Sequence, residues 1–174
     1  MIHLIGIEKH YNTEVGIRQV ILETNLSIPT HKRVGVLGRN GAGKSTLLNM
    51  IAGVDRPNRG MIVREARLSW PLGFAGGFHG DLTARENISF VAQLYRVDYE
   101  ETFARTEEFA EIGAYVDMPV RTYSQGMKSR LAFGLSLAIN FDCYLIDETI
   151  GAGDRFFRQK SRKVFLEQSK GAGM

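Results

Sequence analysis

The hydrophobic positions of this chain fall into alternating stretches, short continuous runs and stretches with helical spacing. Residues 2–7 and 20–28 alternate between apolar and polar side chains, which predicts two strands. Residues 34–37 and 143–146 are short apolar runs, typical of strands that are buried on both faces. Residues 61–69 predict one more strand. The chain should therefore contain a sheet with buried central strands.

Apolar residues recur with helical spacing over residues 43–52, 84–95, 99–112 and the segment that follows Ser124. Ser124 is typical of a helix N-cap, and Asp154 should cap a last helix rich in basic residues. Strand, loop and helix come first, a helical insertion follows, and a strand and a helix complete the order. This order predicts an α/β core with a mostly parallel sheet, an antiparallel N-terminal portion and a helical subdomain near residues 78–140.

Composition limits the kinds of protein that this chain can be. Its 174 residues are 44% hydrophobic and 24% charged, the ordinary balance of one globular domain. The net charge of +3 is too small to imply nucleic-acid binding. The single cysteine excludes a disulfide scaffold, and the longest near-apolar run, residues 131–139, falls far below the ~20 residues of a membrane span. These features predict a soluble, cytoplasmic protein and leave open that it binds a membrane protein.

Residues 38–45, GRNGAGKS, match the phosphate-binding loop pattern GxxxxGK[ST] and lie between a predicted buried strand and a predicted helix. This motif predicts a P-loop NTPase. Glycines let backbone N–H groups turn toward phosphate oxygens, and the helix N-terminus adds partial positive charge. Lys44 should reach the β- and γ-phosphates, and the Ser45 hydroxyl should bind Mg²⁺. The candidate ATP-binding residues here are Gly38, Arg39, Asn40, Gly41, Ala42, Gly43, Lys44, Ser45 and Thr46.

Asp147 and Glu148 directly follow the apolar run at residues 143–146. A carboxylate at the C-terminal end of a buried strand lies beside the phosphate loop in this architecture. We therefore expect Asp147 to hold Mg²⁺, directly or through water. We expect Glu148 to orient or deprotonate the attacking water, so that Glu148 and Lys44 are the candidate catalytic residues. The alternative for Glu148 is an ordinary surface carboxylate.

A polar turn, Tyr123-Ser124-Gln125-Gly126-Met127, opens a predicted helix upstream of the two acids. At this turn the chain resembles the ATP-binding cassette (ABC) family, whose signature loop, usually LSGGQ, has the same position and spacing. Ser124 and Gly126 match that loop, whereas the other three residues depart from it. The resemblance implies that Ser124, Gln125 and Gly126 contact the γ-phosphate bound by the opposite subunit of a head-to-tail homodimer. The alternative is an ordinary helix cap.

The same resemblance assigns two further residues. Tyr11, which follows Lys9 and His10, looks like the aromatic residue that stacks on adenine in this family, and the alternative is a core position. Asp154 falls where the family's D-loop lies and would contact the partner subunit. Its alternative is a simple N-cap, and the two roles are compatible.

The chain departs from the ABC pattern in two places. The loop at residues 69–80 has no glutamine, although family members usually carry one there. The family's switch histidine should lie well downstream of Glu148, and all four histidines of this chain come earlier. We therefore expect one ABC ATPase domain that is C-terminally incomplete, with residues 1–77 and 141–174 as the nucleotide-binding core and residues 78–140 as the helical subdomain.

The loop at residues 69–80 is rich in aromatic residues and glycine. It resembles the loop found in the ATPase subunits of capsular polysaccharide exporters, and the related O-antigen and teichoic acid exporters have a similar loop with less tryptophan. Exposed Trp70, Phe74 and Phe78 would suit docking to an integral membrane subunit. The alternative is that these rings cover the local core.

The resemblance implies the ATPase subunit of an ABC exporter that uses ATP and Mg²⁺, forms a homodimer and binds integral membrane permease subunits. It would power export of a cell-surface polysaccharide from the cytoplasmic face of the bacterial inner membrane, without a nucleic-acid partner. Two alternatives remain open. A P-loop kinase would explain Lys44 and Asp147 but not the turn at residues 123–127. A non-transport ABC ATPase acting on nucleic acid or the ribosome usually carries two cassettes or a long insertion.

Overall fold

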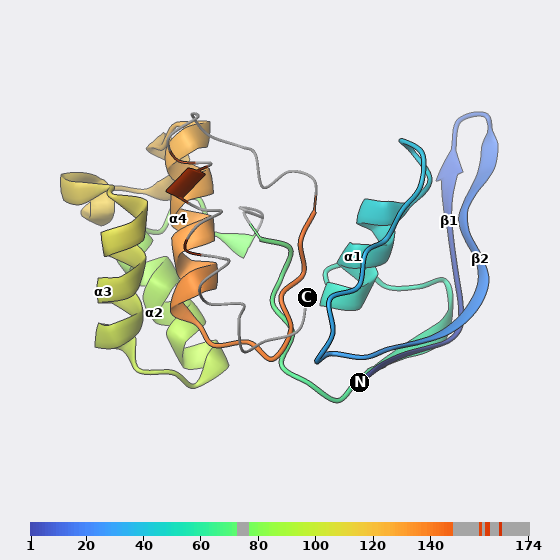
Figure 1. Ribbon diagram of the computed structural model, residues 1–174. Coiled ribbons are helices and arrows are strands. Elements are labelled where there is room, and N and C mark those ends of the chain that lie inside the picture. The colour runs from blue at the N-terminus through green and yellow to red at the C-terminus, as the bar shows by residue number, and fades with distance from the viewer. Residues whose placement is uncertain (73–76, 148–156, 158, 161–163, 165–174) are drawn as a thin grey trace. The chain divides into compact units, whose positions relative to one another are not determined.

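The computed structural model describes residues 1–72, 77–147, 157, 159–160 and 164. These residues form two compact units (Figure 1). The sheet unit comprises Met1–Pro71 and Phe141–Asp147 and contains the strands and one α-helix. The helical unit comprises Leu72–Asn140 together with the described residues between 157 and 164, and it contains three α-helices.

Strands β1 (Ile2–Thr13), β2 (Gly16–Ile28) and β3 (Arg59–Arg64) form an antiparallel sheet in the order β2-β1-β3. β1 and β2 confirm two of the predicted strands and run further than predicted, because a tight turn joins them and pairs Thr13 with Gly16. β3 confirms only the first part of the strand predicted over residues 61–69. The hairpin of β1 and β2 is therefore the longest extended feature of the sheet unit.

One face of this sheet packs on helix α1 (Lys44–Ala52). The buried side chains of this core are Ile2, Leu4, Ile7, Met50, Ile51, Cys143 and Leu145. Arg64 of β3 fixes the end of the helix, since its Nε donates to the Ile51 carbonyl and its Nη2 to the Met50 carbonyl, each at 2.7 Å. Carbonyls in the last turn of a helix have no intrahelical partner, so these bonds satisfy them.

The two apolar runs predicted as parallel strands differ from the prediction. Residues 34–37 form no strand, and Leu37 is 96% exposed. Residues 143–146 contribute one isolated parallel bridge, between Cys143 and Leu68. An apolar run becomes a strand only where a neighbour satisfies its backbone groups, and among the described residues no ladder partner adjoins residues 34–37. The described sheet is consequently antiparallel.

The helical unit contains helices α2 (Ala84–Tyr95), α3 (Tyr99–Ala110) and α4 (Gln125–Ala138). Two 3₁₀ turns, Gly113–Asp117 and Val120–Thr122, lie between α3 and α4. Each α-helix begins at a residue whose side chain accepts a hydrogen bond from a backbone N–H of the first turn, and these N-caps are Thr83, Asp98 and Ser124. The helices predicted at residues 84–95, at residues 99–112 and after Ser124 are confirmed, as is the cap at Ser124, although α3 ends at Ala110. The start of the helix predicted after Asp154 lies outside the described residues.

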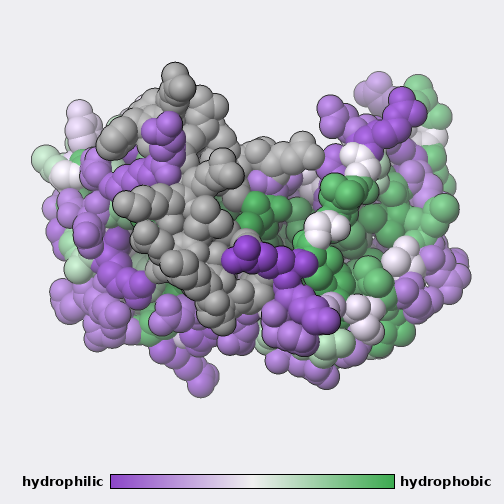
Figure 2. All heavy atoms as spheres, in the orientation of Figure 1, coloured by the Kyte–Doolittle hydropathy of each residue, from purple (hydrophilic) through white to green (hydrophobic). Residues whose placement is uncertain are grey.

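Surface character differs between the two units. In the view of Figure 2 the surface of the helical unit is mostly hydrophilic, whereas hydrophobic residues gather over the sheet unit. The exposed large hydrophobic side chains of the sheet unit include Val15, Ile17, Leu22 and Leu37. No helix among the described residues is long and apolar enough to cross a membrane.

A glycine sets the distance between α3 and α4. A β-carbon placed on Gly134 of α4 would lie 2.9 Å from the backbone carbonyl oxygen of Thr106 in α3 and 3.4 Å from the Phe109 ring. The rings of Phe109 and Phe133 stack beside this contact, with centroids 5.2 Å apart. Because the nearest obstacle is backbone, it cannot move away as a flexible side chain would.

We expect Gly134→Ala to destabilise the protein, although alanine is the better helix former by about 1 kcal/mol. The added methyl group overlaps the Thr106 carbonyl, and overpacking of this kind costs about 1–3 kcal/mol. Urea unfolding followed by circular dichroism measures the difference. Gly77→Ala is the control, since a β-carbon there meets no atom within 4 Å. A Gly134→Ala protein as stable as the wild type would contradict the packing argument.

Candidate functional site

The phosphate loop at residues 38–45 lies against β2. Gly41 and Gly43 adopt left-handed backbone conformations, with φ of 78° and 91°. A β-carbon on Gly43 would lie 2.8 Å from Val20 Cγ1 and 3.2 Å from the Val20 carbonyl oxygen. Both the conformation and the close approach therefore require glycine at position 43. Gly43 is also the N-cap of α1, so the loop ends where the helix begins.

The Lys44 side chain folds back over this loop. Its Nζ donates to the Gly38 carbonyl at 2.9 Å and to the Arg39 carbonyl at 3.3 Å. The ammonium group and the N-terminus of α1 thus place positive charge at the same loop, where anions are favoured. The adjacent Ser45 is exposed and Thr46 is half-buried. The geometry fits a phosphate group and a hydroxyl ligand for a cation.

The segment that carries Asp147 is fixed by hydrogen bonds to residues 67–69. Ser69, which is fully buried, accepts a hydrogen bond from the Leu145 N–H through its Oγ at 2.8 Å. Its own N–H donates to the Cys143 carbonyl at 3.0 Å. Asp147 follows at the end of this paired segment and is half-buried. It belongs to the same unit as the phosphate loop, whereas Glu148 lies outside the described residues.

Tyr11 lies near the end of β1 in a group of polar contacts rather than in the core. Its hydroxyl donates to Asp55 Oδ2 at 3.0 Å, and the residue is 41% exposed. Lys9 Nζ lies 4.9 Å from the ring centroid and donates to Asp55 Oδ1 at 2.7 Å. Burial raises the pKa of Asp55, but the hydrogen bonds from Lys9, Tyr11 and the Arg56 N–H outweigh burial and leave that pKa below its usual value.

The sheet places Tyr11 beside the phosphate loop. Tyr11 of β1 pairs with Arg18 of β2 in the antiparallel register. A β-carbon on Gly41 would lie 3.8 Å from a terminal nitrogen of Arg18. Tyr11, Arg18 and the loop therefore form one continuous surface of the sheet unit.

The sequence analysis missed Lys9, Arg18 and Asp55. The spacing around residues 14–15, which form the hairpin turn, was the signal that could have paired Arg18 with Tyr11. No local pattern pointed to Asp55, because it lies 44 positions after Tyr11. Its contact depends on where α1 ends.

The signature-like turn lies in the helical unit. Ser124 Oγ accepts a hydrogen bond from the Met127 N–H at 3.2 Å and caps α4. The preceding Tyr123 is buried, and its hydroxyl donates to the Tyr115 carbonyl at 2.5 Å. Burial, and secondarily the charge of Asp117, raises the pKa of Tyr123. The departure from leucine at position 123 thus supplies a hydrogen bond that fixes the start of the turn.

The segment at residues 79–83 is paired with the chain that leads into this turn. The Val120 N–H donates to the Leu82 carbonyl at 2.9 Å, and the Arg121 N–H donates to the Gly80 carbonyl at 2.8 Å. Buried Asn87 donates to the carbonyl oxygens of residues 79, 82 and 83. The residues that lead into the turn at 123–127 are therefore hydrogen-bonded to the ordered segment at residues 79–83.

Comparison with known proteins identifies the family. The model of the ABC transporter family matches residues 21–151. The chain belongs to the ABC transporter family. It is 50% identical to the polysialic acid transport ATP-binding protein KpsT of Escherichia coli over 172 residues, which cover 98% of this chain and 77% of that protein. It is 47% identical to the capsule polysaccharide export ATP-binding protein CtrD of Neisseria meningitidis serogroup B, over 98% of this chain and 79% of CtrD.

Solved structures agree on the fold. A dimeric ATP-binding cassette in a post-hydrolysis state, bound to ADP and Pi, aligns with a TM-score of 0.79 over 99% of this chain and 85% of the other, at 22% identity. The predicted fold class, an ABC-type P-loop NTPase, is confirmed, and so is the predicted ABC ATPase activity class. The division into a nucleotide-binding core and a helical subdomain, and the C-terminal incompleteness, stay predictions.

The aromatic residues of the loop at residues 69–80 are only partly described. Trp70 is half-buried and contacts Phe141 edge-on, with ring centroids 5.5 Å apart. Phe78 is half-buried, and Phe74 lies outside the described residues, as does Asp154. Trp70 thus covers the local core at least in part, which is the alternative that the sequence left open.

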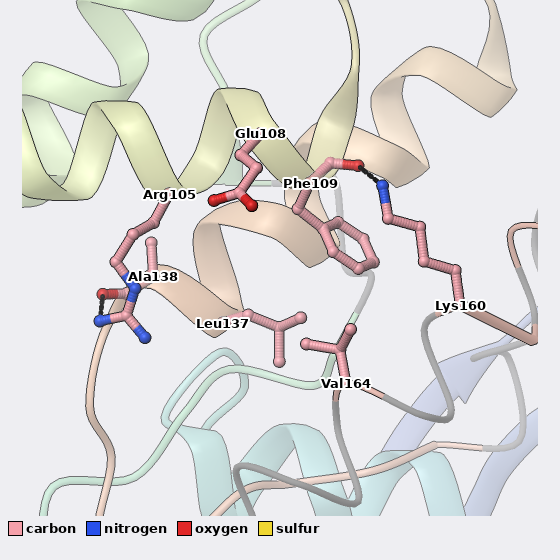
Figure 3. Close-up of a pocket in the computed structure, with 7 residues that line it drawn as sticks. All are labelled: Arg105, Glu108, Phe109, Leu137, Ala138, Lys160 and Val164. Atoms are coloured by element: carbon pink, nitrogen blue, oxygen red, sulfur yellow. Dashed lines mark hydrogen bonds between the residues drawn. The ribbon is translucent and has the colours of Figure 1, made fainter.

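A cavity of about 240 Å³ lies in the helical unit (Figure 3). Two of its polar side chains, those of Arg105 and Lys160, have protein partners. Arg105 donates to the Ala138 carbonyl at 3.5 Å, and Lys160 donates to the Phe109 carbonyl at 3.2 Å and to Glu111. Among the described residues no group of three or more His, Cys, Asp or Glu side chains is arranged to hold a metal ion.

The lowered pKa of Asp55 predicts how stability depends on pH. In the folded protein this pKa lies below the reference value of 3.8, so the Asp55 contacts stabilise the fold above about pH 4. That stabilisation is lost as the pH falls through the lowered folded pKa. We expect Asp55→Asn to reduce the free energy of unfolding at neutral pH and to flatten its decline between about pH 5 and pH 2.

Urea unfolding at a series of pH values measures this dependence. Glu14→Gln makes the same kind of change in the exposed hairpin turn and serves as the control. If Asp55→Asn and wild type lost stability in parallel over that range, the carboxylate would not be linked to folding.

Proposed function

We propose that this chain is the ATP-binding and ATP-hydrolysing subunit of an ABC exporter that powers export of a cell-surface polysaccharide. The observation that carries the proposal is 45–50% identity over almost the whole chain to KpsT, CtrD and the ATP-binding protein BexA of Haemophilus influenzae. The first two are named for polysialic acid transport and capsule polysaccharide export. Membership of the ABC transporter family gives the ATPase, and these relatives suggest the substrate class.

The sheet unit supports ATP binding at residues 38–46. Left-handed Gly41 and Gly43 turn the loop, and Lys44 supplies a cation at the N-terminus of α1. The triphosphate would lie in this loop, and the base would lie against Tyr11. Ser45 and Asp147 would hold Mg²⁺, which neutralises charge on the phosphate oxygens. Glu148 would orient the attacking water and accept its proton.

The helical unit supports a role in a head-to-tail homodimer. Ser124, Gln125 and Gly126 open α4, and a helix N-terminus suits the γ-phosphate bound by a second copy of the chain. Solved ABC cassettes with this fold are dimeric. Asp154 would contact the partner subunit. ATP would close the dimer, and hydrolysis would reopen it and move the membrane subunits.

Integral membrane permease subunits are the proposed partner, at the cytoplasmic face of the bacterial inner membrane. Trp70, Phe74 and Phe78 of the aromatic loop would bind them. Trp70 and Phe78 are half-buried, and such rings combine packing within the domain with exposed area for a partner, which is common at protein interfaces.

Affinity purification of the tagged protein from detergent-solubilised membranes of its own host tests this function. A polytopic membrane protein should co-purify, and its presence should raise the rate of ATP hydrolysis. Phe78→Ala should weaken co-purification while leaving ATP binding intact. Recovery of ribosomes or nucleic acid instead would favour a non-transport ABC ATPase. Turnover that requires a small phosphate acceptor would favour a kinase.

Lys44→Ala should remove most ATP binding. The ammonium group would neutralise phosphate oxygens through charge-assisted hydrogen bonds, each contributing about 1.5–3 kcal/mol, so affinity should fall by at least about 10-fold. Isothermal titration calorimetry with Mg²⁺ and ATP gives the dissociation constants. Lys32→Ala removes an exposed cation just ahead of the loop and is the matched control. Equal ATP affinity in wild type and Lys44→Ala would rule out the loop as the site.

A further inference from the structure

The contacts of Asp55 link the end of α1 to the exposed ring of Tyr11. Asp55 follows Gly53, the left-handed C-cap of α1. One carboxylate oxygen accepts from the Tyr11 hydroxyl at 3.0 Å, and the other accepts from Lys9 Nζ and from the Arg56 N–H, each at 2.7 Å. Three donors therefore hold this carboxylate in one orientation.

Lys9 makes this arrangement hard to change. Its side chain is 9% exposed, and a buried ammonium group requires both a counter-charge and hydrogen-bond acceptors. Asp55 supplies the charge, and the Arg56 carbonyl accepts a second hydrogen bond from Nζ at 2.8 Å. Asp55 is thus fixed mainly from the side of the protein core. Its remaining oxygen presents a fixed acceptor to Tyr11.

A fixed acceptor fixes the phenol ring. An exposed tyrosine ring otherwise samples several rotamers, and a ligand that stacks on it must restrict them at a cost in affinity. Here the hydroxyl is bonded to Asp55, and the Lys9 ammonium lies over the ring at 4.9 Å from its centroid. Tyr11 as a whole is 41% exposed, although its hydroxyl and its ring both have partners. It is an ordered, accessible aromatic platform.

The platform lies beside the phosphate loop. Tyr11 pairs with Arg18 across the hairpin, and Arg18 reaches Gly41 of the loop. Val20, two residues along the same strand, contacts Gly43. A nucleotide whose phosphates lie in the loop would therefore have its base within reach of this part of the hairpin.

We propose that Asp55 is a positioning residue for nucleotide binding: held by Lys9, it orients the Tyr11 ring through the phenol hydroxyl so that the ring accepts a nucleotide base. This proposal rests on the proposed function, in which Tyr11 stacks on adenine. It goes further by assigning the orientation of that ring to a carboxylate and a buried lysine distant in sequence.

Tyr11→Phe tests the proposal, because it removes only the hydroxyl and keeps the ring. Calorimetry in the presence of Mg²⁺ compares two probes, ATP and inorganic tripolyphosphate, which has no base. We expect Tyr11→Phe to weaken ATP binding by about 2- to 12-fold, the value of one hydrogen bond. Tripolyphosphate affinity should be unchanged. Tyr11→Ala should weaken ATP binding by about 5- to 150-fold, the value of a stacked base, again without effect on tripolyphosphate.

A double-mutant cycle assigns the effect to Asp55. Asp55→Asn alone should weaken ATP binding and spare tripolyphosphate. In the Tyr11→Phe background it should add less than its separate effect, because the hydroxyl through which it acts is already gone. A general loss of structure would instead lower the affinity for both probes by the same factor, and that result would overturn the proposal.

The remaining outcomes separate this proposal from the proposed function. If Tyr11→Ala weakens ATP binding and Tyr11→Phe does not, the ring binds the base without help from Asp55, and the positioning role is wrong. If neither variant affects ATP binding while Lys44→Ala does, the loop is the site but Tyr11 is no platform, and the positioning role is again wrong. If Lys44→Ala also has no effect, the proposed site itself fails.

Discussion

The close approach of Gly43 to Val20 is the constraint on which the sheet unit depends. At this point the phosphate loop touches β2 with backbone against side chain, so no β-carbon fits between them. The contact fixes where α1 begins, because Gly43 is its N-cap. Where α1 begins and how long it runs in turn fix where Asp55 emerges, close enough to bond with Tyr11. Loop, helix and hairpin are therefore set by one contact.

The sheet unit holds two lysine charges near the phosphate loop and the hairpin. Two lysines hold their charges in different ways: Lys9 is buried against a carboxylate, whereas Lys44 bonds to two backbone carbonyls of its own loop. The Lys9 pair is expensive to break, since separation would leave a buried charge uncompensated. A bond from the Lys44 ammonium group to a neutral carbonyl is weaker than its bond to a charged phosphate oxygen would be. Lys9 thus suits a structural role, and Lys44 suits exchange between loop and ligand.

Local signals in the sequence were sufficient for the helices and for the chemical identity of the loop. The N-cap at Ser124 and the helix at residues 84–95 were predicted because capping and helical spacing are properties of neighbouring residues. The strand predicted at residues 34–37 is not formed, because a strand needs a partner that no local pattern specifies. The role of Asp55 could not be predicted for the same reason. Its contacts with Lys9 and Tyr11 join segments that only the fold brings together.

Within the helical unit, backbone hydrogen bonds connect the segment that follows Phe78 with the chain that leads into the signature-like turn. The sequence analysis considered these two features separately. Phe78, a proposed docking residue, directly precedes the segment at residues 79–83. Two carbonyl oxygens of that segment accept hydrogen bonds from the N–H groups of Val120 and Arg121, just ahead of the signature-like turn. Tyr123 then anchors the turn through its hydroxyl. These hydrogen bonds give the segment that follows Phe78 a direct backbone connection to the residues that precede Ser124.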